Sequence, residues 1–177
     1  MSASSSRLNG FCKKAAPDGR LPFELTDLFS AEDLSVQINL GSFVLRMVAA
    51  ATQDEDEELS RLLQGLQSIT VRIAEPGRAA GKPFAERMSR ACERLEASGW
   101  QPMLQVRSDG DESSIYLQEA GGRVSGLVVL FTDAQGEAGL IHIQGHLDPD
   151  DLGRLGRTLD LPLPGGEEDT EGKAHHR

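Results

Sequence analysis

The stretch between residues 101 and 147 limits the fold most strongly, because short apolar segments alternate there with turn residues. Four strands are expected in it, at residues 101–108, 113–118, 124–132 and 138–147. The segments between them are rich in Asp, Gly and Ala, which favour hairpin turns, and they are residues 109–111, 120–122 and 133–136. Hairpins join antiparallel neighbours, so the stretch predicts an antiparallel meander. The run Leu127–Phe131 is apolar on both faces, which predicts a central strand with helices over one face of the sheet.

Two further strands are expected nearer the N-terminus. Residues Ser35–Leu40 alternate strictly, with Val36, Ile38 and Leu40 on one side of the strand. Residues Ile69–Ile73 alternate in the same way, and Pro76-Gly77 ends that pattern.

Helical patterns occupy the remaining stretches of the central region. A first helix follows Gly41-Ser42, and a second follows the acidic run Asp54–Glu58, whose carboxylates favour a helix N-terminus. A third begins near Pro83 and ends at Ser98-Gly99. The apolar positions of these helices are Phe43, Val44, Met47 and Val48; Leu59, Leu62, Leu63 and Leu66; and Phe84, Met88, Ala91 and Leu95. A last helix is expected after Asp148, with Asp148 as N-cap, Pro149 at the first position and Asp151 at the third.

These elements predict a single domain between two polar ends. Residues 1–20 are expected to be a disordered leader and residues 165–177 a disordered polar tail, while residues 21–164 form one α+β domain. Residues Leu21–Leu34 are expected to pack on the core as a short helix or an irregular arm. The predicted architecture is a two-layer sandwich, a mainly antiparallel sheet of about six strands with helices on one face.

Composition excludes several classes of protein. With 28 acidic and 18 basic residues the net charge is −10, which argues against nucleic-acid binding. Neither the apolar core of a secretory signal nor a run long enough to cross a membrane is present, which predicts a soluble chain that is not exported. A disulfide between Cys12 and Cys92 is not expected, because the first lies in the leader and the second in a helix.

The His and acidic residues give no metal-site pattern. His142 and His146 share one strand and project from its polar face about 13 Å apart, too far for one metal ion to bridge. They are therefore expected to be surface or second-layer polar side chains. The residues Asp109–Glu112 and Asp148–Asp151 lack the spacing of a calcium loop, and a hairpin turn and a helix cap explain them. For Asp54–Glu58, a solvated helix start is favoured over a site for a divalent cation or a basic partner.

No catalytic or cofactor-binding residues are assigned. The segment Gly77–Lys82 lacks the glycine spacing of a phosphate loop, and Pro83 stands where Ser or Thr is needed. Cys92 lies on an apolar helix face and is expected to be buried or at a boundary rather than reactive. Trp100 and Tyr116 are expected to pack in the core, with the anchoring of a partner as the alternative.

Three segments resemble a known family. They are "LPFELTDLFSAEDLSVQINLGSFVLRMV", "ERLEASGWQPMLQVRSDGDESSIYLQE" and "GLVVLFTDAQGEAGLIHIQGHLDPDDLGRL". In this order they are similar to the bacterial family catalogued as domain of unknown function 4252, over nearly all of residues 21–160. The resemblance implies a small cell-envelope protein of a kind often predicted to be a lipoprotein, encoded near genes for extracytoplasmic-function sigma factors. It implies no catalytic residues, because no activity is established for the family.

The resemblance and the residues together lead to an expected function. We expect a non-enzymatic, envelope-associated protein that acts through a protein partner or self-association in sigma-factor-linked stress signalling. The alternative is a soluble ligand-binding module or an enzyme with a carboxylate-lined cleft. Localisation stays open, because Phe11 precedes Cys12 where a lipoprotein signal has a small residue and no apolar stretch comes before it. The envelope follows from the resemblance, through a lipid anchor absent from this chain, and the cytoplasm follows if Met1 is the native start.

Overall fold

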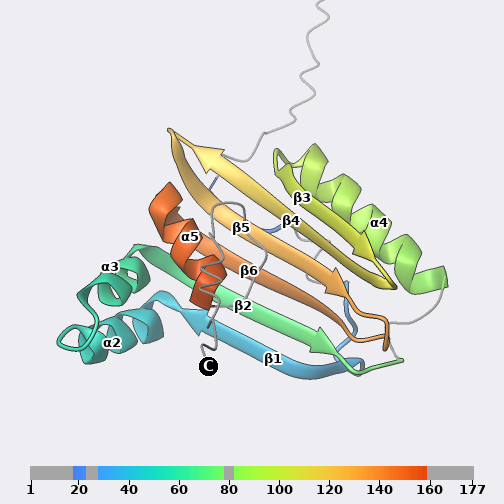
Figure 1. Cartoon of the computed structure of the whole chain (residues 1–177), viewed down its shortest axis with the longest axis horizontal. Coiled ribbons are helices and arrows are strands. Elements are labelled where there is room, and N and C mark those ends of the chain that lie inside the picture. The colour runs from blue at the N-terminus through green and yellow to red at the C-terminus, as the bar shows by residue number, and fades with distance from the viewer. Residues whose placement is uncertain (1–17, 23–27, 78–81, 159–177) are drawn as a thin grey trace, which may run out of the picture. The chain divides into compact units, whose positions relative to one another are not determined.

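The computed structural model describes residues 18–22, 28–77 and 82–158 (Figure 1). The chain divides into two compact units, residues 1–147 and 148–177. The described part of the first contains an open six-stranded antiparallel sheet with three helices, and the described part of the second is one helix. The α+β class is therefore confirmed. Residues 1–17 of the predicted leader and the whole predicted tail, residues 165–177, lie outside the described residues, as do residues 159–164 of the predicted domain.

The six strands all pair antiparallel to their neighbours. They are β1 (Leu34–Gly41), β2 (Leu66–Ala74), β3 (Gln101–Ser108), β4 (Asp111–Ala120), β5 (Arg123–Thr132) and β6 (Ala138–Leu147). The order across the sheet is β1-β2-β6-β5-β4-β3. Strands β3 to β6 form the predicted meander, and β6 pairs on its other side with β2.

Three helices lie among the described residues of the first unit. They are α2 (Ser42–Thr52), α3 (Glu57–Gly65) and α4 (Lys82–Ala97). Helices α2 and α3 lie between β1 and β2 in the chain, and the buried Ser60 hydroxyl joins them by donating to the carbonyl oxygen of Ala49 at 2.8 Å. As predicted, the acidic run starts a helix, because Asp56 is the N-cap of α3 and accepts a hydrogen bond from the Leu59 amide at 2.9 Å.

The hairpin turns follow the expected glycine chemistry. Gly121 and Gly122, between β4 and β5, have φ of +62° and +80°. Two positive φ angles in succession define the type I′ turn, whose twist matches that of the flanking strands. Asp109 and Gly110 likewise form the turn between β3 and β4, so a hairpin accounts for that part of the Asp109–Glu112 segment.

The second unit begins with α5 (Pro149–Thr158). The Asp148 amide donates to Asp151 Oδ2 at 3.1 Å, and the Asp148 carbonyl oxygen accepts from the amides of Asp151 and Leu152. This is the predicted helix start, and the capping contact accounts for the Asp151 carboxylate.

Pairing partners define the two faces of the sheet. One row across all six strands is apolar and consists of Ile38, Val71, Ile141, Val129, Ile115 and Leu104. We call the side that carries this row the apolar face. The adjacent row points to the other side and consists of Asn39, Thr70, His142, Val128, Tyr116 and Pro102. We call that side the arm face, because it contacts the arm, which we define as the described residues 18–22 and 28–33.

The arm face carries a hydrophobic core. Arm residues Leu28 and Phe29 and the apolar stripe of α4 pack there with side chains from the strands. Phe29 and Phe84 stack with ring centroids 5.8 Å apart. The buried members of this cluster are Leu28, Phe29, Ala74, Phe84, Ala91, Leu95, Trp100, Tyr116, Val128, Leu130, Ala138 and Leu140. The core positions predicted for α4 are thereby confirmed, and so is the packing role of Trp100 and Tyr116.

No helix among the described residues is long and apolar enough to cross a membrane.

Candidate functional site

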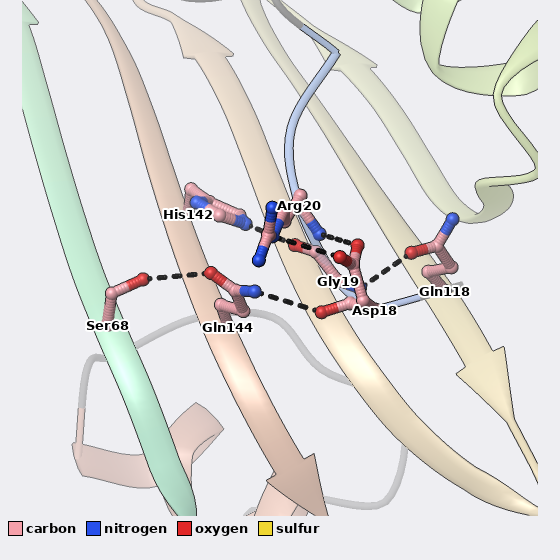
Figure 2. A network of polar contacts seen from close by, with 7 residues as sticks. All are labelled: Asp18, Gly19, Arg20, Ser68, Gln118, His142 and Gln144. Carbon is pink, nitrogen blue, oxygen red and sulfur yellow. Dashed lines mark hydrogen bonds and ion pairs between the residues drawn. The ribbon is translucent and has the colours of Figure 1, made fainter. Parts of the chain in front are cut away.

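Three features of the first unit are candidates for function: a clamp that binds the arm, a cleft beside α4, and an exposed apolar surface on β1 and α2. The clamp is a network of hydrogen bonds that joins the arm to β2, β4 and β6 (Figure 2). At its centre the Gly19 amide donates to Gln118 Oε1 at 2.8 Å, and His142 Nε2 lies 2.7 Å from the Gly19 carbonyl oxygen. Side chains of β4 and β6 therefore hold both main-chain groups of Gly19.

Further polar contacts fix the orientation of the clamp side chains. Gln144 Nε2 donates to the Asp18 carbonyl oxygen at 3.0 Å, while its Oε1 accepts from the Ser68 hydroxyl at 3.3 Å. Gln118 Nε2 donates to the Ser98 carbonyl oxygen at 3.2 Å, which leaves its Oε1 to accept from Gly19. Because each amide uses both of its ends, neither is free to rotate.

Gly19 cannot be replaced in this position without strain. Its φ of +75° lies in the left-handed region, and a Cβ there would fall on the carbonyl oxygen of Ser125. Below it, a Cβ on Gly126 would meet both Gly19 and the ring of Trp100. Two glycines thus allow the arm to approach the sheet closely.

His142 is a structural donor in this clamp. The residue is 5% exposed, and its ring meets that of Trp100 edge to face, with centroids 6.1 Å apart. A carbonyl oxygen only accepts, so Nε2 carries the proton. Burial lowers the pKa of His142 below its ordinary value of 6.5, and the bond to Gly19 opposes that shift. The imidazole is therefore neutral and held in one tautomer at neutral pH.

The two histidines do not form a joint site. The expectation that His142 lies on a polar face is wrong, because Ala138 and Leu140 on the same side of β6 are buried in the core. His146 is exposed, as expected, and lines a shallow depression of about 310 Å³ with residues of α2 and the α3–β2 junction. Within the described ranges, no three His, Cys, Asp or Glu side chains are grouped so as to hold a metal ion.

The second feature is a cleft of about 740 Å³ between α4, β3, β4 and the β5–β6 turn. Its carboxylates include Glu112, which pairs with Arg107 at 2.8 Å, and Asp133, which accepts from the amides of Gln135 and Glu137. These two acidic groups therefore already have partners within the protein.

Cys92, expected to be buried or at a boundary, lines the same cleft and is half-buried. Burial raises the pKa of the Cys92 thiol. The neighbouring Glu112 and Glu96 raise this pKa further, whereas the hydrogen bond with Tyr116 lowers it. Burial likewise raises the pKa of the Tyr116 hydroxyl, which hydrogen-bonds to Cys92, Gln105 and Glu96. A protonated thiol is a weak nucleophile, so the geometry fits the expected boundary role.

The third feature is an exposed apolar surface at the β1 edge of the sheet and on α2. We call it the β1–α2 surface. Phe43 is 70% exposed and Met47 is 58% exposed, one turn apart on the helix. The complete set of large exposed apolar side chains in this stretch is Val36, Ile38, Phe43, Val44, Met47 and Val48.

This surface corrects an expectation from the sequence. The apolar positions named for the first helix included Phe43 and Met47, yet the residues that α2 buries are Leu45 and Ala49. The helix is apolar on nearly every side, so its periodicity does not identify the buried face. Residues 34–53 contain one charged side chain, Arg46, in a chain in which 26% of residues are charged. That local lack of charge was the available signal.

The clamp left no comparable signal in the sequence. Gln118 and Gln144 occupy ordinary polar positions on alternating strands, and Asp18-Gly19-Arg20 has the composition of a leader. The described arm begins at Asp18, within the predicted leader. In the Gly77–Lys82 segment, residues 78–81 lie outside the described residues, as does Cys12.

Comparison with known proteins identifies one family. A family model described as "Domain of unknown function (DUF4252)" matches residues 29–155. Neither the curated proteins nor the solved structures contain a match. The matched range includes β1 and α2 together with all the other strands.

Proposed function

The chain belongs to the DUF4252 family, and we propose that it is a non-enzymatic protein whose β1–α2 surface binds another protein. The observation that carries this proposal is the exposure of Phe43 and Met47 on a helix that lies inside the family-matched range. Large apolar groups that stand together at a surface are typical of protein-binding sites. Exposed side chains of this size also reduce solubility unless a partner covers them.

The charge distribution supports the same proposal. The whole chain carries −10, but the β1–α2 surface has only Arg46 as a charged neighbour on α2. The centre of a protein–protein interface is depleted in charged residues, and Met and Phe are enriched there. The surface thus has the composition of an interface core.

The finer part of the proposal concerns the place of action. We propose that the protein works at the bacterial cell envelope, in stress signalling linked to sigma factors, and the family resemblance supports this. Labelling with palmitate in cells that express the native gene together with its upstream sequence tests the envelope association. Incorporated lipid supports a lipid anchor, and a chain that stays unlabelled and fractionates away from the envelope contradicts it.

The interaction itself is testable by site-specific crosslinking in cells of the native host. A photoreactive amino acid placed at Met47 is expected to give a defined adduct that mass spectrometry identifies as one protein. Glu93, exposed on α4, is the matched control position and is expected to give none. The double variant Phe43→Ser/Met47→Ser, with the photoreactive group moved to Val44, should lose the adduct. Equal labelling from both helices would contradict the proposal.

A second candidate function rests on the cleft beside α4. Its volume of about 740 Å³ suits a small molecule, and it combines apolar residues such as Met88 with polar ones such as Gln105. A ligand of this cleft would raise the melting temperature of the protein. Ser89→Phe, which fills the cleft from its exposed rim, should abolish that increase while Phe43→Ser leaves it unchanged.

A further inference from the structure

We infer that the partner of the β1–α2 surface is a second copy of this chain, whose β1 pairs antiparallel with β1 of the first about a two-fold axis at Ile38. The two sheets then form one continuous sheet. This inference rests on the proposed function, because it names the protein that the β1–α2 surface binds.

The first argument is the open edge of β1. Within the part of the chain that the structure describes, β1 has one strand neighbour, β2. Its outer edge therefore presents main-chain donors and acceptors along a strand of eight residues. The strand contains no charged residue and no proline, and Ile38 is 43% exposed. Such an edge invites pairing with another strand.

The opposite edge of the same sheet provides the contrast. Strand β3 contains Pro102, which has no main-chain donor, and its pairing with β4 is irregular between Pro102 and Leu104. It also carries Arg107, paired with Glu112. Proline, irregular pairing and charge are the usual means of preventing edge-to-edge association. Strand β1 also pairs irregularly, with β2 between Leu34 and Val36, but it has neither a proline nor a charge, so it is the less protected edge of the sheet.

The second argument is that β1 is complementary to itself. Pairing about Ile38 places Ile38 opposite Ile38 and Val36 opposite Leu40 on the apolar face. On the arm face the same register places Gln37 opposite Asn39, so that amide meets amide. Cross-strand apolar pairs and hydrogen-bonding pairs both stabilise a sheet. A two-fold interface repeats every contact off the axis, so each match except that of Ile38 with Ile38 occurs twice.

The third argument concerns charge. Two copies that each carry −10 repel one another, and a contact between them is least opposed where neither brings an acidic group. All residues of β1 are neutral, so no two like charges lie opposite each other in this register. Because α2 follows β1 directly, the two α2 helices flank the paired strands at opposite ends of the interface.

Disulfide trapping tests the register in the full chain. In a background of Cys12→Ser and Cys92→Ser, the variant Ile38→Cys brings two cysteines opposite each other. Directly opposed residues in antiparallel strands have Cα atoms about 4.5–5.5 Å apart, which suits a disulfide. We expect a covalent dimer on mild oxidation. Val36→Cys alone should give none, but it should form a mixed disulfide with Leu40→Cys when the two proteins are combined.

Sedimentation velocity tests the association itself. The unmodified chain is expected to dimerise, and Ile38→Lys should raise the dissociation constant about tenfold or more, because it opposes two like charges. Val106→Lys is the matched control, since Val106 is 39% exposed on the protected edge strand β3. It should leave the association unchanged. If the unmodified chain dimerises but the Ile38→Cys variant forms no disulfide on oxidation, the inference is overturned.

The same experiments separate this inference from the proposed function. A chain that stays monomeric at the highest soluble concentration would overturn the self-pairing. If crosslinking from Met47 then identifies a different protein, the proposed interaction still stands. If crosslinking from Met47 gives the same labelling as crosslinking from Glu93, the self-pairing and the proposed function are both contradicted.

Discussion

Gly19 and His142 meet at the point where the arm crosses the sheet, and each depends on the other. The carbonyl oxygen of Gly19 satisfies the buried imidazole, and the imidazole fixes the arm. A buried polar group without a partner costs about 1–3 kcal/mol, so loss of either residue leaves the other with an unsatisfied polar group. At this scale the stability of the protein depends on contacts that are far apart in the chain.

Replacement of Gly19 by Ala is expected to release the arm. A left-handed φ alone costs a residue other than glycine about 1–3 kcal/mol. The clash of the new Cβ with Ser125 adds to that cost. Tryptic cleavage after Arg20, which the docked arm restricts, should become faster. Gly121→Ala is the control, because Gly121 also has a positive φ but no atom lies near its Cβ. If both variants are cleaved equally fast, the close approach to Ser125 does not hold the arm.

The lowered pKa of His142 predicts a stability that falls in mild acid. The unfolded state takes up a proton near pH 6.5, whereas the folded state resists it until a lower pH. Stability is therefore full above pH 6.5 and declines as the pH falls from there toward the folded pKa. The unfolding free energy falls by at most about 1.4 kcal/mol per pH unit from this one group.

Urea denaturation of the wild type and of His142→Gln at about pH 7.5 and pH 5.5 measures this dependence. The variant should lose less stability between the two values than the wild type. His146→Gln, at the exposed position of the same strand, is the control and should behave as the wild type does. A wild type and a His142→Gln variant with equal losses would contradict the assignment.

Helix α2 is the element in which local pattern and tertiary structure disagree most. The sequence predicts its existence and its start after Gly41, and both are confirmed. The sequence does not identify its buried face, because apolar residues occupy nearly all positions from Phe43 to Ala51. Helix α4 is the opposite case, since its apolar stripe alternates with charged residues and its core positions were predicted. Amphipathic contrast, rather than hydrophobicity, makes a helix face predictable.

Substitutions on α2 separate its exposed face from its buried one. Phe43→Ser/Met47→Ser should change the unfolding free energy of the monomer by less than about 0.5 kcal/mol, as surface substitutions do. Leu45→Ala should lower it by about 2–5 kcal/mol, because Leu45 is 1% exposed. Denaturation at low protein concentration measures both. A large loss in the double variant would mean that these side chains are part of the core.

At the scale of the whole molecule, the sheet and its meander were predictable from strand periodicity and turn chemistry. The place of β1 and β2 was not, because nothing in their alternation states that β2 pairs with β6. The same holds for the clamp, in which Gly19 contacts a residue 123 positions later. Local signals specify elements, whereas long-range partners depend on packing that a single sequence does not display.

The net charge of the molecule predicts how salt affects the proposed dimer. Two chains of −10 repel one another, and this repulsion weakens as the screening length falls from about 30 Å at 10 mM salt to about 10 Å at 100 mM. The dissociation constant from sedimentation should therefore decrease over this range. A dimer held by opposite charges would instead weaken, and that result would contradict an uncharged β1 interface.

The position of β6 has a consequence for the synthesis of the protein. It is the last of the described strands to be made, yet it lies between β2 and β5. A nascent chain that ends before Ala138 therefore carries two separate pieces of sheet, β1-β2 and β3-β4-β5, with no strand to join them. Each piece exposes the edge that β6 later occupies, and the arm lacks His142 and Gln144. The ribosome releases these partners late, so the growing chain exposes strand edges that favour aggregation until β6 emerges.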